Sequence, residues 1–319
     1  MKIGVIGAGA VGAACLLSAA MRGSAREIVV VNRNRKRARG VATDLQYGAA
    51  LSSVVEIRDG DYADLAGASL VMITAGANEK TGGAIDRSDP TGRLRLLDMN
   101  VGVYADILPQ LHKAAPDAVV LVVTDPPDPL ADFARLFGFQ HVLSTGTYLD
   151  SLRFRFHLAR QLQLAPASVD ANVLGEHGTS EVFVWSSARV GGVPVLDLVA
   201  GTRSQPAEIR RAIEQDVRYA NITVIEGTWA SQYGIGMVCS RITEMVLRDE
   251  RAVIPVGSYN PTYGVTLSVP SVVGRSGVVQ IVEPDLAEDE RRAMQRSADT
   301  LRQAIDRVQD IAARLRPSR

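Results

Sequence analysis

Residues 2–12 read KIGVIGAGAVG, and this stretch decides the fold. The short apolar run Lys2–Ile6 predicts a buried strand, and the small, apolar residues Ala10–Met21 predict a helix directly after it. Between them, glycines at positions 7, 9 and 12 follow the pattern Gly-x-Gly-x-x-Gly. A strand that runs through such a turn into a helix is typical of the first βαβ unit of a doubly wound α/β fold.

Apolar runs and helical stretches alternate over the first half of the chain, which predicts parallel strands with crossover helices. The further runs are Ile28–Val31, Ser69–Thr74, Ala118–Thr124 and Val142–Thr145. After about residue 147 the pattern changes to a helix at 151–164, strand-like segments at 169–173, 182–184, 264–270 and 278–282, and an amphipathic helix at about 289–315. We therefore predict an α/β fold with a Rossmann dinucleotide-binding domain at residues 1–146, built on a parallel sheet, and a mixed α+β substrate and catalytic domain at 147–319. The active site is expected between them.

Composition excludes several classes of protein. The chain has 319 residues, of which 46% are hydrophobic and 22% charged, as in ordinary soluble globular proteins. Lysine plus arginine and aspartate plus glutamate both number 35, so no charge excess indicates a nucleic-acid or membrane partner. The two cysteines are too few for a disulfide framework or a zinc site, and no other metal site is indicated. Because the first strand leaves no room for a signal peptide, we expect a cytoplasmic protein.

The glycine turn predicts where a dinucleotide binds. Gly7 permits the tight turn, Gly9 lets the backbone approach a pyrophosphate, and Gly12 allows close packing of helix on strand. The backbone N–H groups of Ala10 and Val11 open the helix, where the positive end of the helix dipole favours phosphate.

The end of the second predicted strand leaves the choice of dinucleotide open. An acidic residue that binds the ribose 2′-hydroxyl is expected there, but this chain has Asn32, followed by Arg33. A neutral amide does not repel a 2′-phosphate, and an adjacent guanidinium could pair with one. The arginine could equally belong to a solvated helix start. NAD and NADP therefore both remain possible cofactors.

Two segments after the predicted dinucleotide domain carry the parts of an acid–base site. They are LDSLR at 149–153 and LGEHG at 174–178. His177 offers an imidazole that titrates near neutrality, Asp150 a carboxylate that could orient it, and Arg153 a guanidinium that could grip a carboxylic acid. Together with a nicotinamide site, these groups indicate reversible hydride transfer on a 2-hydroxy acid.

At this point the chain resembles the L-lactate/malate dehydrogenase family over essentially its whole length. The GEHG at 175–178, rather than GGHG, resembles the lactate dehydrogenase side of the family. The matching segments, in family order, are GAGAVG (7–12), ITAGAN (73–78), GRLRLLDMN (92–100), LDSLRFR (149–155), LGEHGTSEVFVWSS (174–187), YGIGMVCSRITEMVLRDE (233–250) and PSVVGRSGVVQIVEP (270–284).

The resemblance implies a role for each of these side chains. His177 would exchange a proton with the substrate, Asp150 would fix its tautomer, Arg153 would bind the substrate carboxylate and Arg93 would polarise the carbonyl from a closing loop. It also implies a homodimer or homotetramer acting on a small 2-oxo or 2-hydroxy acid. Further cofactor contacts are expected from Thr74, Ala75, Gly76, Asn100 and Thr124.

Three positions are expected to shape the substrate pocket, and two of them depart from the family pattern. Asp125 stands where the family usually has an asparagine, and Glu79 stands where glutamine or arginine selects the substrate. Ser231 lies in the segment expected to contact the substrate tail. A carboxylate at position 79 would repel a second, distal carboxylate on the substrate. We therefore predict a monocarboxylic substrate and poor reduction of oxaloacetate. Two alternatives remain: a substrate with a cationic tail, or a weakly active nucleotide-binding paralogue.

One further departure concerns regulation. Some bacterial members are activated by a sugar bisphosphate that binds an arginine and a histidine. Arg155 matches the arginine, but Asp170 stands at the histidine position. A carboxylate there would repel phosphate, so the resemblance predicts that this anion site is lost.

Overall fold

A parallel sheet forms the first half of the molecule, as the alternating pattern predicts. The computed structural model describes residues 1–51, 55–77, 86, 92–200 and 205–315. Among these, six parallel strands pair in the order β3-β2-β1-β4-β5-β6. The strand order reverses between β1 and β4, and in doubly wound sheets ligands bind at the carboxyl ends of the strands at that point. The strands are β1 (Lys2–Ile6), β2 (Glu27–Val31), β3 (Glu56–Asp59), β4 (Leu70–Ile73), β5 (Val119–Val122) and β6 (Val142–Ser144).

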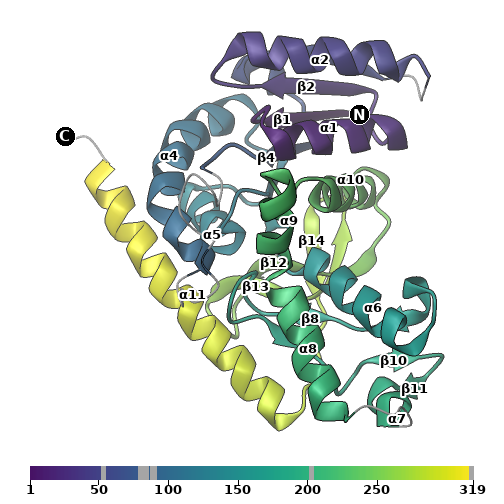
Figure 1. Cartoon of the computed structure of the whole chain (residues 1–319). Coiled ribbons are helices and arrows are strands. Elements are labelled where there is room, and N and C mark those ends of the chain that lie inside the picture. The colour runs from purple at the N-terminus through teal and green to yellow at the C-terminus, as the bar shows by residue number, and fades with distance from the viewer. Residues whose placement is uncertain (52–54, 78–85, 87–91, 201–204, 316–319) are drawn as a thin grey trace.

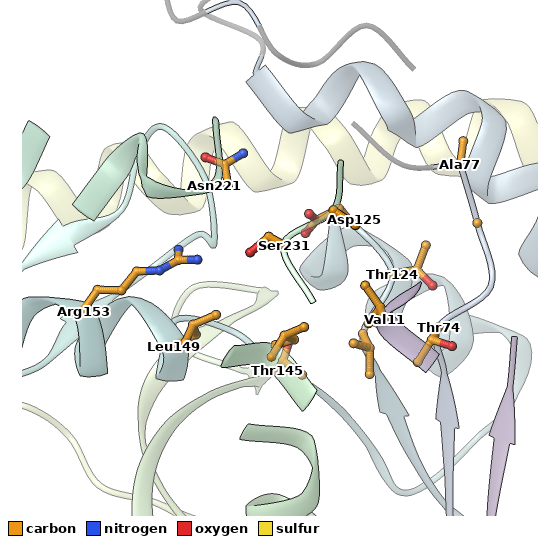
Figure 2. Close-up of a pocket in the computed structure, with 14 residues that line it drawn as sticks. Val11, Thr74, Ala77, Thr124, Asp125, Thr145, Leu149, Arg153, Asn221 and Ser231 are labelled. Atoms are coloured by element: carbon orange, nitrogen blue, oxygen red, sulfur yellow. The ribbon is translucent and has the colours of Figure 1, made fainter. Parts of the chain in front are cut away.

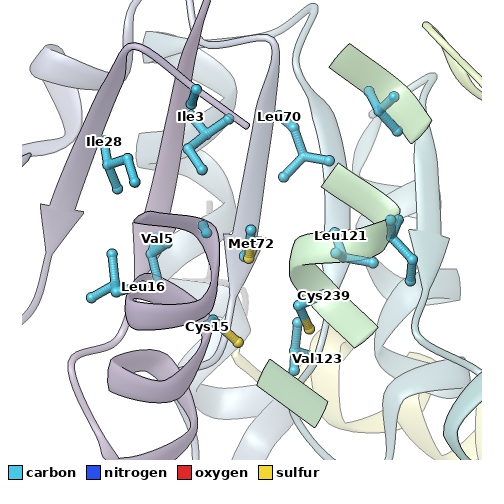
Figure 3. Close-up of a cluster of buried hydrophobic side chains, with 14 of the residues drawn as sticks. Ile3, Val5, Cys15, Leu16, Ile28, Leu70, Met72, Leu121, Val123 and Cys239 are labelled. Carbon is cyan, nitrogen blue, oxygen red and sulfur yellow. The ribbon is translucent and has the colours of Figure 1, made fainter. Parts of the chain in front are cut away.

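Helices cover both faces of this sheet because its strands are apolar on both sides (Figure 1). Ile3 and Val5 of β1 face one core with Ile28 of β2, whereas Ile6 faces the other. The first core lies under α1 (Ala10–Arg22), α2 (Arg35–Ala49) and α10 (Tyr233–Arg248), and part of it is drawn in Figure 3. The second lies under α4 (Leu97–Ala114), α5 (Pro127–Phe137) and α11 (Glu288–Leu315). The predicted apolar stripe of α11 is buried at Met294, Ala298, Leu301 and Val308.

The sheet does not end with the dinucleotide-binding half. Strand β12 (Ala252–Asn260) pairs antiparallel with β6 through Gly257 and Ser144, and β13 (Val265–Gly274) and β14 (Gly277–Ile281) continue the sheet. The division expected at residues 146 and 147 falls between β6 and the following helix, and one nine-stranded sheet of described residues runs across it. The two halves are therefore joined by backbone hydrogen bonds as well as by side-chain packing.

The remaining elements pack as a smaller α+β layer beside this sheet. Trp185 and Phe154 lie at the centre of its apolar core. Its helices are α6 (Tyr148–Leu162), α7 (Val195–Ala200), α8 (Pro206–Arg218) and α9 (Ala220–Thr228), and its strands are β7 (Val169–Asp170), β8 (Val173–Leu174), β9 (Val182–Phe183), β10 (Arg189–Val190) and β11 (Val193–Pro194). The short 3₁₀ helix η3 (Pro166–Ser168) also belongs to this layer, whereas η1 (Tyr62–Leu65) and η2 (Gly92–Leu96) belong to the first half of the chain. No helix among the described residues is long and apolar enough to cross a membrane.

Candidate active site

The glycine turn has the geometry that a bound pyrophosphate requires. Gly7 has φ +111°, a backbone conformation that side chains disfavour, and a Cβ on Gly12 would lie 2.0 Å from the carbonyl oxygen of Gly7. A Cβ on Gly9 would meet no atom within 4 Å, so space is open above this residue. Helix α1 begins at Ala10 without a side-chain cap, which leaves its first N–H groups available to an anion. These residues fit a dinucleotide.

The side chain of Asn32 fastens the glycine turn to the end of β2. Its Oδ1 accepts a hydrogen bond from the Ala8 N–H at 2.9 Å, and its Nδ2 donates to the Asn34 carbonyl at 3.1 Å. Arg37 of α2 donates its Nε–H to the Ala8 carbonyl at 2.6 Å. Arg33 lies exposed beside this group. A ribose at this edge would therefore meet an amide and nearby guanidinium groups rather than a carboxylate.

Three polar side chains predicted to contact the cofactor hold the loops around it. Thr74 donates to the Gly7 carbonyl at 3.0 Å, and Thr124 donates to the Ala75 carbonyl at 2.9 Å. Asn100 of α4 accepts from the Ala77 N–H at 2.7 Å and donates to the Asp125 carbonyl at 2.6 Å. These bonds tie together the loops that follow β1, β4 and β5. Gly76 packs against Thr124 and Asn100, where a Cβ would lie 2.3 Å from Thr124 Cγ2.

Asp150 connects the predicted acid–base residue to the predicted carboxylate clamp. One oxygen of Asp150 forms a short hydrogen bond with His177 Nδ1, and the other accepts from Arg153 Nη1 at 2.8 Å. The Asp150 side chain is 2% exposed, so its charge acts on both partners in a dry environment. Asp150 and Arg153 share one face of α6 because they are three residues apart. His177 reaches this face from the loop between β8 and β9.

A second aspartate, Asp128 near the start of α5, holds the backbone of the histidine loop. Its Oδ2 accepts a hydrogen bond from the His177 backbone N–H at 2.9 Å, and its Oδ1 accepts one from the Ser144 hydroxyl at 2.5 Å. Burial raises the pKa of Asp128 to about 6, although these two hydrogen bonds favour the charged form. Sequence reasoning did not single out Asp128. A buried carboxylate beside two prolines gives no signal until the fold shows what it contacts.

Asp125 faces the other side of the imidazole. Its Oδ1 lies 3.7 Å from His177 Nε2, the ring nitrogen opposite the one that binds Asp150. The carboxylate that departs from the family pattern therefore lies in the site, as the sequence position indicated. Two carboxylates therefore lie near one imidazole, one at each ring nitrogen.

Asp125 and Arg153 line one cavity between the two halves of the chain (Figure 2), and their contacts with His177 and Asp150 place that pair beside it. The dinucleotide-binding half contributes Val11, Thr74, Gly76, Ala77, Val123, Thr124, Asp125 and Thr145, and the other half contributes Leu149, Arg153, Asn221, Ala230, Ser231 and Ile235. Ser231, a predicted substrate contact, lines the cavity, and so does Asn221, which the sequence did not single out. Glu79 falls outside the described residues. The backbone of Arg93 lies in η2. No cluster of potential metal ligands occurs in the described part of the chain.

A Rossmann sheet with a dinucleotide turn, and a histidine–aspartate pair in contact with an arginine that lines the cavity, define a class of NAD-linked oxidoreductases. Comparison with known proteins identifies the family. A family model described as the lactate/malate dehydrogenase NAD binding domain matches residues 1–140, and one described as the lactate/malate dehydrogenase alpha/beta C-terminal domain matches residues 147–312. The chain belongs to the lactate/malate dehydrogenase family.

Individual relatives are similar over nearly the whole length. An L-lactate dehydrogenase of Deinococcus radiodurans is 42% identical, covering 95% of this chain and 97% of the relative. One of Thermus aquaticus is 41% identical over 95% of this chain and 98% of its own. A solved lactate dehydrogenase from a Medee basin deep-sea metagenome library superposes with a TM-score of 0.88 at 30% identity, covering 97% of this chain and 98% of that one. This chain is thus an oxidoreductase acting on a 2-hydroxy acid, and its first domain is an NAD-binding domain.

Proposed function

We propose that this chain interconverts a monocarboxylic 2-oxo acid and its L-2-hydroxy acid with a nicotinamide dinucleotide, as a lactate dehydrogenase does. The observation that carries the proposal is Asp150, which binds the imidazole of His177 and the guanidinium of Arg153 at once. The fixed separation of these two groups suits a substrate whose carboxylate and carbonyl are adjacent. A dinucleotide bound at the glycine turn supplies the hydride to the carbonyl carbon.

His177 provides the proton in this proposal. During reduction the protonated ring gives its Nε2 proton to the substrate oxygen while the carbonyl carbon gains the hydride, which leaves a neutral ring and a hydroxyl group. The Nδ1–H group of His177 remains hydrogen-bonded to the Asp150 carboxylate. This bond holds the neutral ring in the tautomer whose Nε2 can take the proton back during oxidation. The backbone bond from His177 to Asp128 limits the movement of the ring. Two buried carboxylates thus fix the position of one proton donor.

Arg153 binds the substrate carboxylate, and we assign to Arg93 the polarisation of the carbonyl from the loop that precedes α4. The Arg153 guanidinium is 16% exposed and keeps one hydrogen bond to Asp150, so its other N–H groups can reach a carboxylate in the cavity. In Figure 2 the guanidinium points into the same space as the Ser231 hydroxyl. A planar fork held from behind is well suited to a bidentate contact.

The substrate class follows from the charges in the cavity. Among its described lining residues, Arg153 is the only cation and Asp125 the only carboxylate. A second carboxylate on the substrate would have no cationic partner there and would lie near Asp125. We therefore propose a monocarboxylic substrate and poor reduction of oxaloacetate. Glu79, if it faces the cavity, would add to this preference.

The Asp125 carboxylate also favours a second candidate substrate. A 2-oxo acid with an amino or guanidino tail would place a cation near Asp125, and an ion pair in a closed cavity is strong. The arrangement of His177, Asp150 and Arg153 argues against a nucleotide-binding paralogue with little turnover, because a binding protein has no need of a proton donor held by two carboxylates.

We also propose that NADP is accepted alongside NAD. The support is Asn32, whose neutral amide would not repel a 2′-phosphate, and the exposed guanidinium of Arg33 beside it. The chain is proposed to act in the cytoplasm as a homodimer or homotetramer. Cys15 and Cys239 are free thiols, which suits a reducing compartment.

One panel of assays tests these proposals. Purified protein is given pyruvate, 2-oxobutyrate, oxaloacetate and a 2-oxo acid with an amino tail, with NADH and NADPH separately, and the loss of nicotinamide absorbance is followed. We expect pyruvate or another monocarboxylate to be reduced best and oxaloacetate poorly. A preference for oxaloacetate would contradict the pocket argument, a preference for the amino-tailed acid would support the second candidate, and no turnover of any acid would support the paralogue.

A further inference from the structure

The far wall of the cavity carries a buried amide that the proposed reaction does not use. Asn221 lies on α9, its residue is 6% exposed, and it lines the cavity (Figure 2). The structure shows no hydrogen bond from its side chain to any described residue. Water in the cavity can bind this amide, so a ligand that displaces the water must replace its hydrogen bonds or leave the amide unpaired.

A second polar group lies beside it. Ser231 is half-buried and lines the same cavity, and its hydroxyl likewise forms no hydrogen bond with the described residues. The neighbouring Thr228 hydroxyl, in contrast, donates to the Ala230 carbonyl at 3.0 Å. The end of α9 therefore satisfies the Thr228 hydroxyl, which does not line the cavity, and leaves the Ser231 hydroxyl available to a ligand.

The positions of the reacting groups decide which part of a substrate meets this wall. In the proposed reaction Arg153 binds the carboxylate, His177 meets the carbonyl oxygen, and the dinucleotide lies beside the ends of β1, β4 and β5. The substituent on the carbonyl carbon is then the part that faces Asn221, Ala230 and Ser231.

We infer, on the basis of the proposed reaction, that the substrate tail is polar and hydrogen-bonding. The fitting class is a 3-hydroxy-2-oxo acid or its reduced 2,3-dihydroxy form, with the Asn221 amide and the Ser231 hydroxyl binding the 3-hydroxyl. An apolar tail of the same size would leave both polar groups buried and unpaired, and such sites reject the apolar analogue strongly.

The test compares two substrates of nearly equal size. 3-Hydroxypyruvate carries a hydroxyl where 2-oxobutyrate carries a methyl group, so the ratio of their kcat/KM values reports recognition of the tail. We expect the wild-type enzyme to prefer 3-hydroxypyruvate by at least about tenfold. Asn221→Leu, which keeps the volume and removes the amide, should lower that ratio by about tenfold, and Ser231→Ala should lower it to a smaller extent. Thr223→Val, on the exposed side of α9, should leave the ratio unchanged.

The outcomes separate this inference from the proposed reaction. If the enzyme reduces pyruvate and 2-oxobutyrate but does not prefer 3-hydroxypyruvate, the inference of a polar substrate tail is wrong, while the proposed reaction stands. Equal losses for both acids in Asn221→Leu would assign the amide to the carboxylate and also overturn the inference. Failure to reduce any 2-oxo acid would contradict the reaction itself. If Asn221→Leu does not fold, the wild-type ratio and Ser231→Ala still decide.

Discussion

At the scale of single residues, His177 is the side chain on which the proposed chemistry depends most. His177→Asn should lower kcat by roughly two to four orders of magnitude, the range that general acid–base catalysis supplies. Binding of NADH, measured by its fluorescence, should stay near normal because His177 lies away from the glycine turn. A variant that keeps most of its turnover would remove His177 from the mechanism.

Asp128 makes stability depend on pH in a direction opposite to that of most carboxylates. Its pKa is raised to about 6 by burial, whereas in the unfolded chain it loses its proton near pH 4. Between these values the folded chain holds more protons than the unfolded one, so this group lowers the free energy of unfolding as pH rises from about 4 to about 6, by roughly 3 kcal/mol.

Asp128→Asn should remove that contribution. The amide oxygen can still accept the His177 N–H, and the Ser144 hydroxyl can turn to accept from the new NH₂ group. Urea unfolding at several pH values between 4 and 7 should show that the free energy of unfolding falls less steeply with rising pH in the variant than in the wild type. Asp117→Asn, at an exposed position, serves as the control and should follow the wild type. Equal pH profiles for wild type and Asp128→Asn would show that Asp128 does not titrate in this range.

At the scale of elements, we propose that the end of β2 sets the preference between NADH and NADPH. In Asn32→Asp one oxygen can keep the bond to the Ala8 N–H, while the other becomes a ribose acceptor and repels a 2′-phosphate. This variant should raise kcat/KM with NADH relative to kcat/KM with NADPH. Arg33→Ala should lower kcat/KM with NADPH and leave that with NADH nearly unchanged. Arg39→Ala, whose side chain is 69% exposed and pairs with Asp59, is a suitable control. If neither Asn32→Asp nor Arg33→Ala changes the ratio of kcat/KM for NADH and NADPH, this segment is only a solvated helix start.

Helix α6 and strand β7 provide a prediction about regulation. Arg155 donates to the Ala171 carbonyl at 2.8 Å and to Asn172 Oδ1 at 3.0 Å, and it lies 3.7 Å from the Asp170 carboxylate. The guanidinium expected to bind an effector phosphate already has three acceptors nearby. Fructose bisphosphate at millimolar concentration should therefore leave the half-saturating substrate concentration unchanged. A clear decrease would show that the anion site is intact.

At the scale of the whole molecule, an apolar groove between α1, α2 and α10 supports the proposed homo-oligomer. Four large side chains lie exposed there: Leu17 (48%), Met21 (69%), Tyr233 (66%) and Met237 (67%). A contiguous apolar surface of this kind is typical of an association site. Light scattering after gel filtration should give at least twice the chain mass of 34.2 kDa.

A charge in that groove should weaken the assembly. Met237→Glu should lower the mass at micromolar concentration, because the carboxylate would be desolvated against a partner. Leu136→Glu changes an exposed residue of α5, on the opposite face of the sheet, and should keep the wild-type mass. A wild-type protein that runs as a single chain at all concentrations would refute the proposal.

Much of the molecule could be predicted from local pattern. Apolar runs separated by helical stretches gave the parallel strands and their covering helices, and the glycine spacing gave the dinucleotide turn. Strands β3 and β12 were missed, since β3 is the polar segment EIRD and β12 contains Pro255 and Gly257, residues that disfavour strands. The extension of the parallel sheet by β12, β13 and β14 was missed for a similar reason, because pairing partners are not encoded in local pattern.

What the sequence determined by itself is what short-range spacing determines: the family, the dinucleotide turn and the shared face of Asp150 and Arg153 on α6. Only the tertiary structure decided which distant side chains meet. It brought Asp128 to the backbone of His177 and Asn221 to the cavity wall. The physical reason is that hydrogen bonds, charge interactions and burial act over a few ångströms in space, whatever the separation along the chain.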